Sequence, residues 1–262
     1  MDEIMKNPEI VPDKISNPIN RKVIIGILGI GLGIFIALNL SSEDDAGTIA
    51  LIPSLVFSAG VAILSFIMAK QNENGILAKA YFILGLAFTS YVTAEVLFYT
   101  FELILEIDSY PSIADVFFFA LYPGIMAFLL LNMKYFHTGF TLFQKIWVPA
   151  IPIFALIAYI IMSISIPDAE LNFDFYYDLI FVAAASTTLS FTIIGALTFR
   201  EGILGPIWLL LVIGLMINTA GDVWYYHLEI FGEYFDAHPV TVAWFVANMI
   251  MIYALYKHIK SV

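Results

Sequence analysis

The sequence predicts an all-α, polytopic membrane protein with eight transmembrane helices. Of its 262 residues, 61% are hydrophobic and only 13% are charged, and the mean hydropathy is +0.91. A soluble domain of this composition would expose too little charge to stay dispersed in water, so lipid is the expected solvent. Polar, turn-rich stretches at 41–47 and 71–75 interrupt the apolar runs, as helix ends require.

Eight segments meet or approach the roughly 20 apolar residues that cross a bilayer core of about 30 Å. Their expected bounds are 22–40, 48–69, 77–104, 113–133, 146–166, 175–198, 204–229 and 240–257. Residues 1–21 are polar and contain three prolines, which is typical of a cytoplasmic tail rather than of a cleavable signal peptide. We therefore expect a multi-pass protein of the cell membrane, with the lipid bilayer as its main partner.

The basic residues predict the orientation of the chain. Threading eight spans places all 11 Lys and Arg on one side, in the two termini and the 70–79, 134–145 and 199–202 connections. Short loops rich in Lys and Arg stay in the cytoplasm, so both termini are expected inside. The outer face is then acidic and should concentrate cations, although outer loops also carry acids simply to stay solvated. The net charge of −11 argues against nucleic acid as a partner.

An internal duplication is indicated because Gly75–Glu102 aligns without a gap onto Gly202–Glu229. The identical residues are Gly75, Ile76, Leu77, Leu84, Val96, Tyr99 and Glu102, which meet Gly202, Ile203, Leu204, Leu211, Val223, Tyr226 and Glu229. The polar register also coincides, since Glu95 meets Asp222. We expect two four-helix repeats, 22–135 and 136–262, which run the same way and are related by an axis along the membrane normal.

In each repeat the polar residues form one stripe. They are Tyr91, Glu95, Tyr99 and Glu102 in the first, and Asn218, Asp222, Tyr226 and Glu229 in the second, spaced four, four and three apart. Glu95 and Asp222 lie about 10 Å inward from Glu102 and Glu229. A carboxyl in hydrocarbon costs on the order of 3 kcal/mol, so both should face the bundle interior.

These residues predict a ligand pocket in the outer half of the bundle. Its expected lining is Glu95, Asp222, Tyr91, Asn218, Tyr99 and Tyr226. The alternative is purely structural, because a protonated acid beside a Tyr also joins two membrane helices, with a contribution of about 1 kcal/mol.

A motif at residues 109–123 opens the fourth span. Ser112 and Asp115 have the spacing of a capping box, which gives Asp115 a structural role beside its candidate place in the pocket. Pro123 has no N–H for the carbonyl of Phe119, and it is expected to kink the helix around an internal cavity.

The same motif carries a resemblance to a known family. Pro-Ser-x-Ala-Asp-Val-Phe from Pro111, with its aromatic run and Tyr122-Pro123, resembles the multi-pass sensor regions ahead of diguanylate cyclase, cyclic-di-nucleotide phosphodiesterase and kinase domains in bacteria and archaea. The segment 220–225, with a later Trp244, is similar to their second half. The resemblance covers roughly residues 75–257 and implies an input module with a generally unknown ligand. Because the chain ends at Val262 with no cytoplasmic effector, a signalling output is expected to need a partner protein.

A second, weaker site is expected at the outer mouth. His227, His238, Glu233 and Asp236 share that side, where they could hold a hard or borderline metal ion or serve as ordinary interfacial groups. No Cys occurs, which excludes thiolate ligands and disulfides. The Lys residues lie at span ends rather than at the mid-span position that retinal requires. The cofactor stays unassigned.

The sequence favours a sensory or ligand-binding module over three alternatives. A proton- or cation-coupled transporter or channel fits duplicated halves with acids in the membrane, but no comparable group marks the inner half of any span. An accessory subunit of a larger membrane complex is equally compatible with the composition. An intramembrane aspartyl hydrolase would use Asp178 and Asp222, which lie at comparable depths, yet Thr219 replaces the first Gly of the presenilin-like motif. An enzymatic role is the less favoured one.

Overall fold

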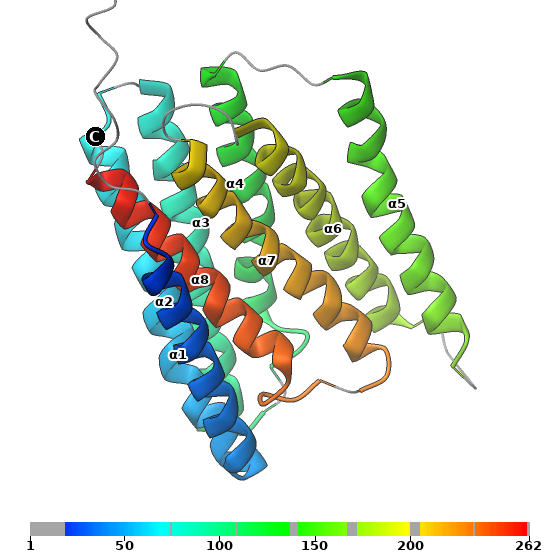
Figure 1. Cartoon of the computed structure of the whole chain (residues 1–262). Helices are drawn as coiled ribbons and strands as arrows, with labels where there is room; N and C mark the ends of the chain where they lie inside the picture. The colour runs from blue at the N-terminus through cyan, green and yellow to red at the C-terminus, as the bar shows by residue number, and fades with distance from the viewer. Residues whose placement is uncertain are drawn as a thin grey trace, which may run out of the picture.

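The computed structural model describes residues 19–73, 75–107, 109–136, 141–166, 172–199, 205–232 and 234–260. Within these residues it is entirely helical, with eight helices long and apolar enough to cross a membrane. They are α1 (Arg21–Leu40), α2 (Glu43–Gln71), α3 (Gly75–Tyr99), α4 (Ile113–Tyr135), α5 (Leu142–Ile164), α6 (Phe173–Phe199), α7 (Gly205–Glu229) and α8 (Pro239–Ile259) (Figure 1). The prediction of eight spans is confirmed. Most of the expected tail, residues 1–18, lies outside the described residues.

The helix ends follow from local sequence. Ser42 caps α2, so this helix begins several residues before the predicted 48, and His238 caps α8 directly before Pro239. The predicted capping box of α4 is confirmed, because the Asp115 carboxyl accepts from the Ser112 N–H at 2.6 Å. The third span, Gly75–Leu105, matches the predicted 77–104 closely. A π-helix, η3 (Thr100–Leu105), continues α3 and ends at Glu106, which has a left-handed backbone.

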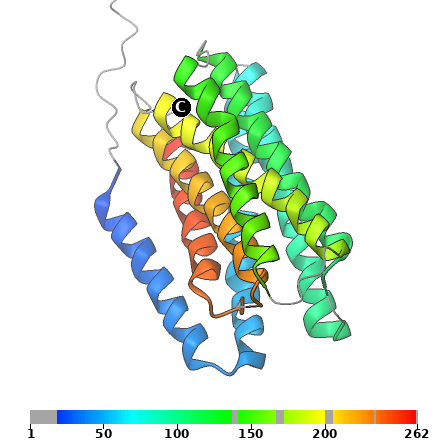
Figure 2. The same ribbon diagram turned by 90° about the vertical axis from the view of Figure 1, so that its right-hand side faces the viewer.

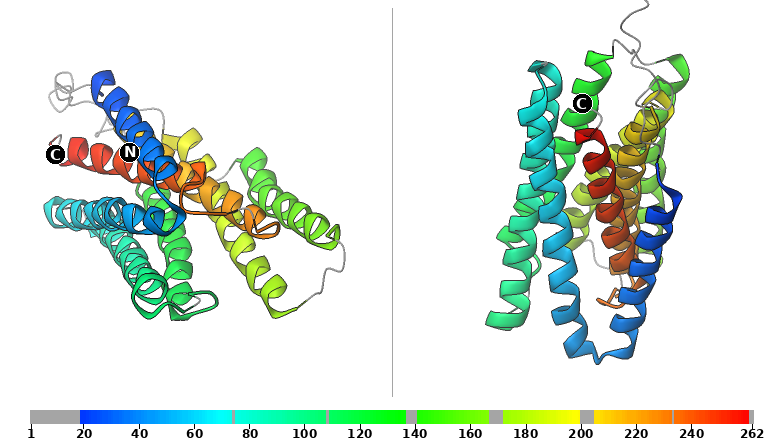
Figure 3. Two further views of the ribbon diagram at one scale, coloured as in Figure 1. Left: turned by 90° about the horizontal axis from the view of Figure 1, so that it is seen from below. Right: turned by 60° about the vertical axis from the view of Figure 1, so that its left-hand side comes forward.

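Six of the helices close into a ring. Each of the pairs α2·α3, α3·α4, α4·α6, α6·α7, α7·α8 and α8·α2 packs extensively, and the view along the bundle in Figure 3 shows this order. In the ring, α3 and α7 stand opposite each other without the extensive helix packing that joins neighbours. Side chains, rather than backbone contact, therefore fill the centre of the bundle.

The remaining two helices lie outside the ring. α5 packs on α6 and stands at the edge of the bundle in Figure 1, and α1 packs on α8 and α2 and stands at the edge in Figure 2. Their outward side chains are apolar and open, as for Ile25 at 68% and Phe154 at 76% exposure. Such exposure suits a lipid-facing surface and would be costly in water.

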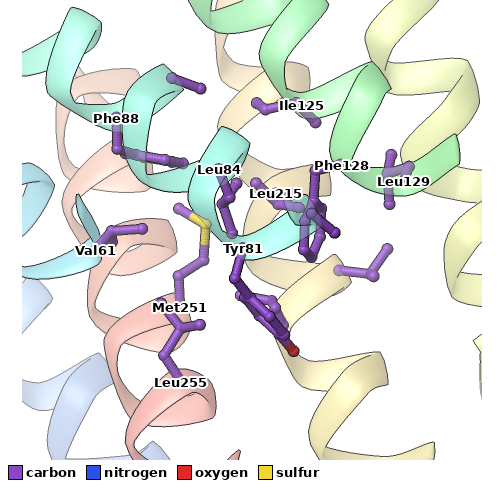
Figure 4. Packing of buried hydrophobic residues seen from close by; sticks show 14 of the residues in the cluster. Val61, Tyr81, Leu84, Phe88, Ile125, Phe128, Leu129, Leu215, Met251 and Leu255 are labelled. Atoms are coloured by element: carbon purple, nitrogen blue, oxygen red, sulfur yellow. The ribbon is translucent and has the colours of Figure 1, made fainter. Parts of the chain in front are cut away.

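Buried apolar side chains occupy the ring at the end opposite the 106–112 and 230–238 connections. Tyr81 packs against Phe128 and Trp208 with ring centroids 5.6 and 5.7 Å apart, and Leu84, Phe88 and Leu215 lie close by (Figure 4). α4 continues through Pro123, and the kink expected there stays a prediction.

Close contact between α3 and α4 depends on Gly124 and gives a test of this packing. A Cβ at Gly124 would lie 2.4 Å from the Cβ of Ala87, an atom fixed to the α3 backbone. Gly124→Ala should therefore force the two helices apart and destabilise the protein by about 1–3 kcal/mol. The control is Gly29→Ala in α1, where a Cβ meets nothing within 4 Å. Thermal unfolding in detergent measures both; equal midpoints for the two variants would contradict the ring.

Candidate functional site

A cavity of about 110 Å³ lies inside the ring, at the end that carries the 106–112 and 230–238 connections. Its lining comes from α2, α3, α4, α7, α8 and two connections, and it is mostly aromatic with three acids. The lining residues are Ser54, Tyr91, Glu95, Phe98, Tyr99, Tyr110, Asp115, Phe118, Leu121, Tyr122, Asp222, Tyr225, Tyr226, Tyr234, Thr241, Trp244, Phe245 and Asn248. One water needs roughly 10–15 Å³ by such a measure, so the cavity has room for a small solute.

Glu95 enters the cavity from α3. It is 7% exposed, and Tyr91, one turn earlier on the same helix, and Ser54 of α2 lie beside its carboxyl. Tyr91 is itself buried, and it also interacts electrostatically with Asp222 across the ring. The hydroxyl groups give this acid a polar setting within an otherwise apolar bundle, which lowers the cost of its burial.

Asp222 enters from the opposite side, on α7. It is also 7% exposed, with Trp244 and Tyr122 beside its carboxyl, and Glu95 adds an unfavourable charge interaction. Its Oδ2 atom makes no hydrogen bond in the described structure, and neither does the indole Nε1 of Trp244. Gly221 makes this arrangement possible, because a Cβ there would lie 2.6 Å from Trp244 Nε1. α8 can thus press its indole against α7.

The structure brings most of the predicted pocket residues together. Glu95, Asp222, Tyr91, Tyr99, Tyr226 and Asp115 all line the cavity. Asn218 does not; it is fully buried one turn deeper in α7, with neither side-chain polar atom hydrogen-bonded. Whether these residues bind a ligand stays a prediction.

Sequence reasoning missed the contribution of α8. Trp244 and Asn248 are four residues apart, so they share one helix face, and both line the cavity. Asn248 is 1% exposed and its Oδ1 makes no hydrogen bond in the described structure. A polar residue one turn after a Trp in an apolar span was the available signal. No sequence signal marked the aromatic wall of Tyr122, Tyr225 and Tyr234, because aromatic residues are frequent throughout the chain.

Asp178 does not line the cavity, but it is hydrogen-bonded to Tyr110, which does. The hydroxyl of Tyr110 donates to its Oδ1, and that of Tyr159 donates to its Oδ2 at 3.2 Å. These bonds join the connection before α4, the periphery helix α5 and α6. Because no hydrogen bond in the described structure joins Asp178 to Asp222, the contacts give no support to a shared proton of the aspartyl-hydrolase kind.

The two histidines of the predicted metal site contact backbone atoms of their own helices. The ring Nδ1 of His227 is 2.6 Å from the Val223 carbonyl, and that of His238 accepts from the Val240 N–H at the start of α8. Among the described residues no group of three or more His, Cys, Asp or Glu is placed to hold a metal ion. Glu233 lies outside the described residues, so the four-residue site stays a prediction.

A buried polar contact occurs at the other end of the ring. The Tyr81 hydroxyl and His258 Nδ1 are 2.6 Å apart, under the indole of Trp208. Tyr81 lies 14 residues before Glu95 on α3, or about 21 Å along the axis. The fully buried Leu84, Phe88 and Leu215 lie between the two levels. Buried apolar side chains thus lie between the cavity and this contact.

No protein-family model, curated protein or solved structure matches this chain.

Asp236, in the connection between α7 and α8, yields a test by pH. Burial, and to a lesser extent Glu102, raises the pKa of Asp236. A carboxyl with a raised pKa holds its proton more tightly in the folded than in the unfolded chain, so its contribution to stability is present at low pH and is lost as the pH rises through the folded pKa. Asp236→Asn should therefore unfold at a higher temperature than the wild type near neutral pH, and this gain should shrink on acidification.

The matched control is Asp174→Asn, an exposed acid in the first turn of α6. The measurement is the unfolding temperature of the wild type and both variants across the acidic and neutral pH range. A gain for Asp236→Asn that does not change with pH would contradict the assigned cause.

Proposed function

We propose that this protein is a sensory or ligand-binding membrane module whose ligand occupies the cavity between α3 and α7. The observation that carries this proposal is that two residues of the cavity lining, Asp222 and Asn248, each have a buried side-chain oxygen, Oδ2 and Oδ1, that makes no hydrogen bond in the described structure. Buried acceptors are nearly always bonded, and exceptions call for a functional or structural reason. A ligand that donates to both oxygens supplies that reason.

The separation of the cavity from the buried Tyr81–His258 contact favours binding over transport. A carrier or channel needs polar groups along a path to both sides of the membrane. Here the apolar layer of Leu84, Phe88 and Leu215 closes the bundle below the cavity. A pocket that ends at such a layer suits a module that reads one side of the membrane.

We further propose that the cavity opens toward the outer face and that both termini are cytoplasmic. The distribution of Lys and Arg supports this orientation. With it, the 106–112 and 230–238 connections next to the cavity are extracellular. The acidic face then surrounds the entrance to the pocket.

The proposed duplication agrees with the order of helices in the ring. A two-fold axis along the bundle would exchange α2 with α6, α3 with α7 and α4 with α8, and it would map each ring contact onto another. The peripheral α1 and α5 would also be exchanged. In the proposed repeats, 22–135 and 136–262, Glu95 and Asp222 are equivalent positions, although residues 202–204 at the start of the alignment lie outside the described residues.

The mechanism follows from the central position of α3 and α7. Because side chains rather than helix packing connect these two helices, a ligand between them can change their separation. Such a response needs two states with different affinity for the ligand. The resemblance to sensor regions suggests that a cytoplasmic effector, or a partner in a membrane complex, reads this change.

Removing both acids tests the pocket. Glu95→Gln with Asp222→Asn keeps the side-chain shapes, so the variant should fold while losing its ligand response. Thermal unfolding in nanodiscs with a panel of amino acids, amines, sugars, carboxylates and nucleosides provides the measurement. A ligand at 100 times its Kd should stabilise the wild type by about 2.7 kcal/mol and the variant far less. Equal stabilisation of both proteins would refute this site.

Single cysteines test the orientation, because the chain has none of its own. Ser42→Cys, before α2, should react with a membrane-impermeant maleimide in intact cells. Gln71→Cys, at the end of the same helix, should react only after the membrane is permeabilised. Both positions are exposed, so access to the thiol does not limit the comparison. The reverse pattern would place the acidic face in the cytoplasm.

A further inference from the structure

The unpaired oxygens of two residues that line the cavity indicate the kind of group that a ligand must present. Asp222 Oδ2 on α7 and Asn248 Oδ1 on α8 are both acceptors. Among the fully buried, unbonded side-chain atoms of the described lining residues, Trp244 Nε1 is a donor, and it already lies beside the Asp222 carboxyl. Acceptors exceed donors in this set, so a ligand group rich in N–H or O–H would complement it.

The charges of the lining residues indicate the sign of the charge that a ligand should carry. Glu95, Asp222 and Asp115 contribute three carboxyl groups, and the described lining residues include no Lys, Arg or His. Ionised carboxyls in a cavity of this kind are stabilised by an opposite charge and destabilised by one another. A cationic ligand supplies the compensation that the lining lacks.

The remaining wall specifies an organic rather than a metallic cation. Aromatic rings, among them Tyr99, Phe118 and Trp244, make up most of the lining, and ring faces attract cations and cover apolar groups. A metal ion needs several hard ligands around one point, and no suitable group of three occurs among the described residues. The wall therefore suits a hydrocarbon body attached to the charge.

We infer that the cavity binds a small primary ammonium compound, with its nitrogen between Asp222, Asn248 and Glu95 and its hydrocarbon part against the aromatic wall. This inference rests on the proposed ligand-binding function and names the class of ligand. A primary ammonium group has three N–H donors and no acceptor, which matches the excess of acceptors. The cavity of about 110 Å³ limits the ligand to a compact molecule.

Calorimetric titration of the full chain in lipid nanodiscs tests the class, with empty nanodiscs as the blank for partition into lipid. Benzylamine is the probe, and benzyl alcohol and benzoate have nearly the same shape with no charge and with negative charge. Benzylamine should bind at least about tenfold more tightly than either, because only it carries a charge-assisted donor. Benzyltrimethylammonium keeps the charge but has no N–H donor, and it should also bind about tenfold more weakly.

Two variants locate the binding. Asp222→Asn and Asn248→Leu should each weaken benzylamine binding, the former by about tenfold or more because it removes a charge-assisted bond. Asp174→Asn, which removes an acid outside the lining, should leave the affinity unchanged. If a cavity variant fails to fold, the comparison of the four probes on the wild type still decides the question.

The outcomes separate the two proposals. Equal affinity for benzylamine and benzyl alcohol, or no benzylamine binding above the empty-nanodisc blank, overturns the ammonium assignment. If benzyl alcohol or benzoate binds instead and Asp222→Asn abolishes that binding, the ammonium assignment is wrong while the ligand-binding pocket stands. If benzylamine binds equally well to wild type and Asp222→Asn, the placement of its nitrogen is wrong.

Discussion

The arrangement of this bundle depends on the cost of placing a carboxyl group in hydrocarbon. Glu95 and Asp222 sit in membrane-spanning helices, where contact with acyl chains would cost on the order of 3 kcal/mol each. Both are 7% exposed and line one cavity within the helix ring. The ring thus keeps both acids out of lipid. It also brings them into one cavity, where the described lining residues include no basic partner.

The ring explains how one bundle has a polar and an apolar end. Its facing helices, α3 and α7, leave the centre to side chains, so the sequence of each turn decides what the centre contains. Leu84, Phe88 and Leu215 make one layer of the bundle apolar, whereas Glu95 and Asp222 make the layer nearer the cavity end polar. Helices α1 and α5 complete the lipid-facing surface and contribute nothing to the cavity.

Much of this could be predicted from the sequence, because bilayer thickness and the helical repeat are strong constraints. They gave the eight spans and the shared stripe of Glu95 and Asp222. Neighbour relations across the ring were not predictable. The polar face of Trp244 and Asn248 became informative only when α8 was seen to pack on α7, and Asn218 proved to lie below the cavity although it belongs to the same stripe. The switch to a π-helix at Thr100 had no sequence signal.

A double-mutant cycle between the two acids tests the central claim most directly. Glu95→Gln, Asp222→Asn and the double variant are compared with the wild type by their free energies of unfolding at neutral pH, without ligand. Groups that share one cavity should be coupled, so the effects should depart from additivity by at least about 0.5 kcal/mol. Additivity within about 0.3 kcal/mol would mean that the carboxyls do not sense each other, and it would contradict the shared cavity.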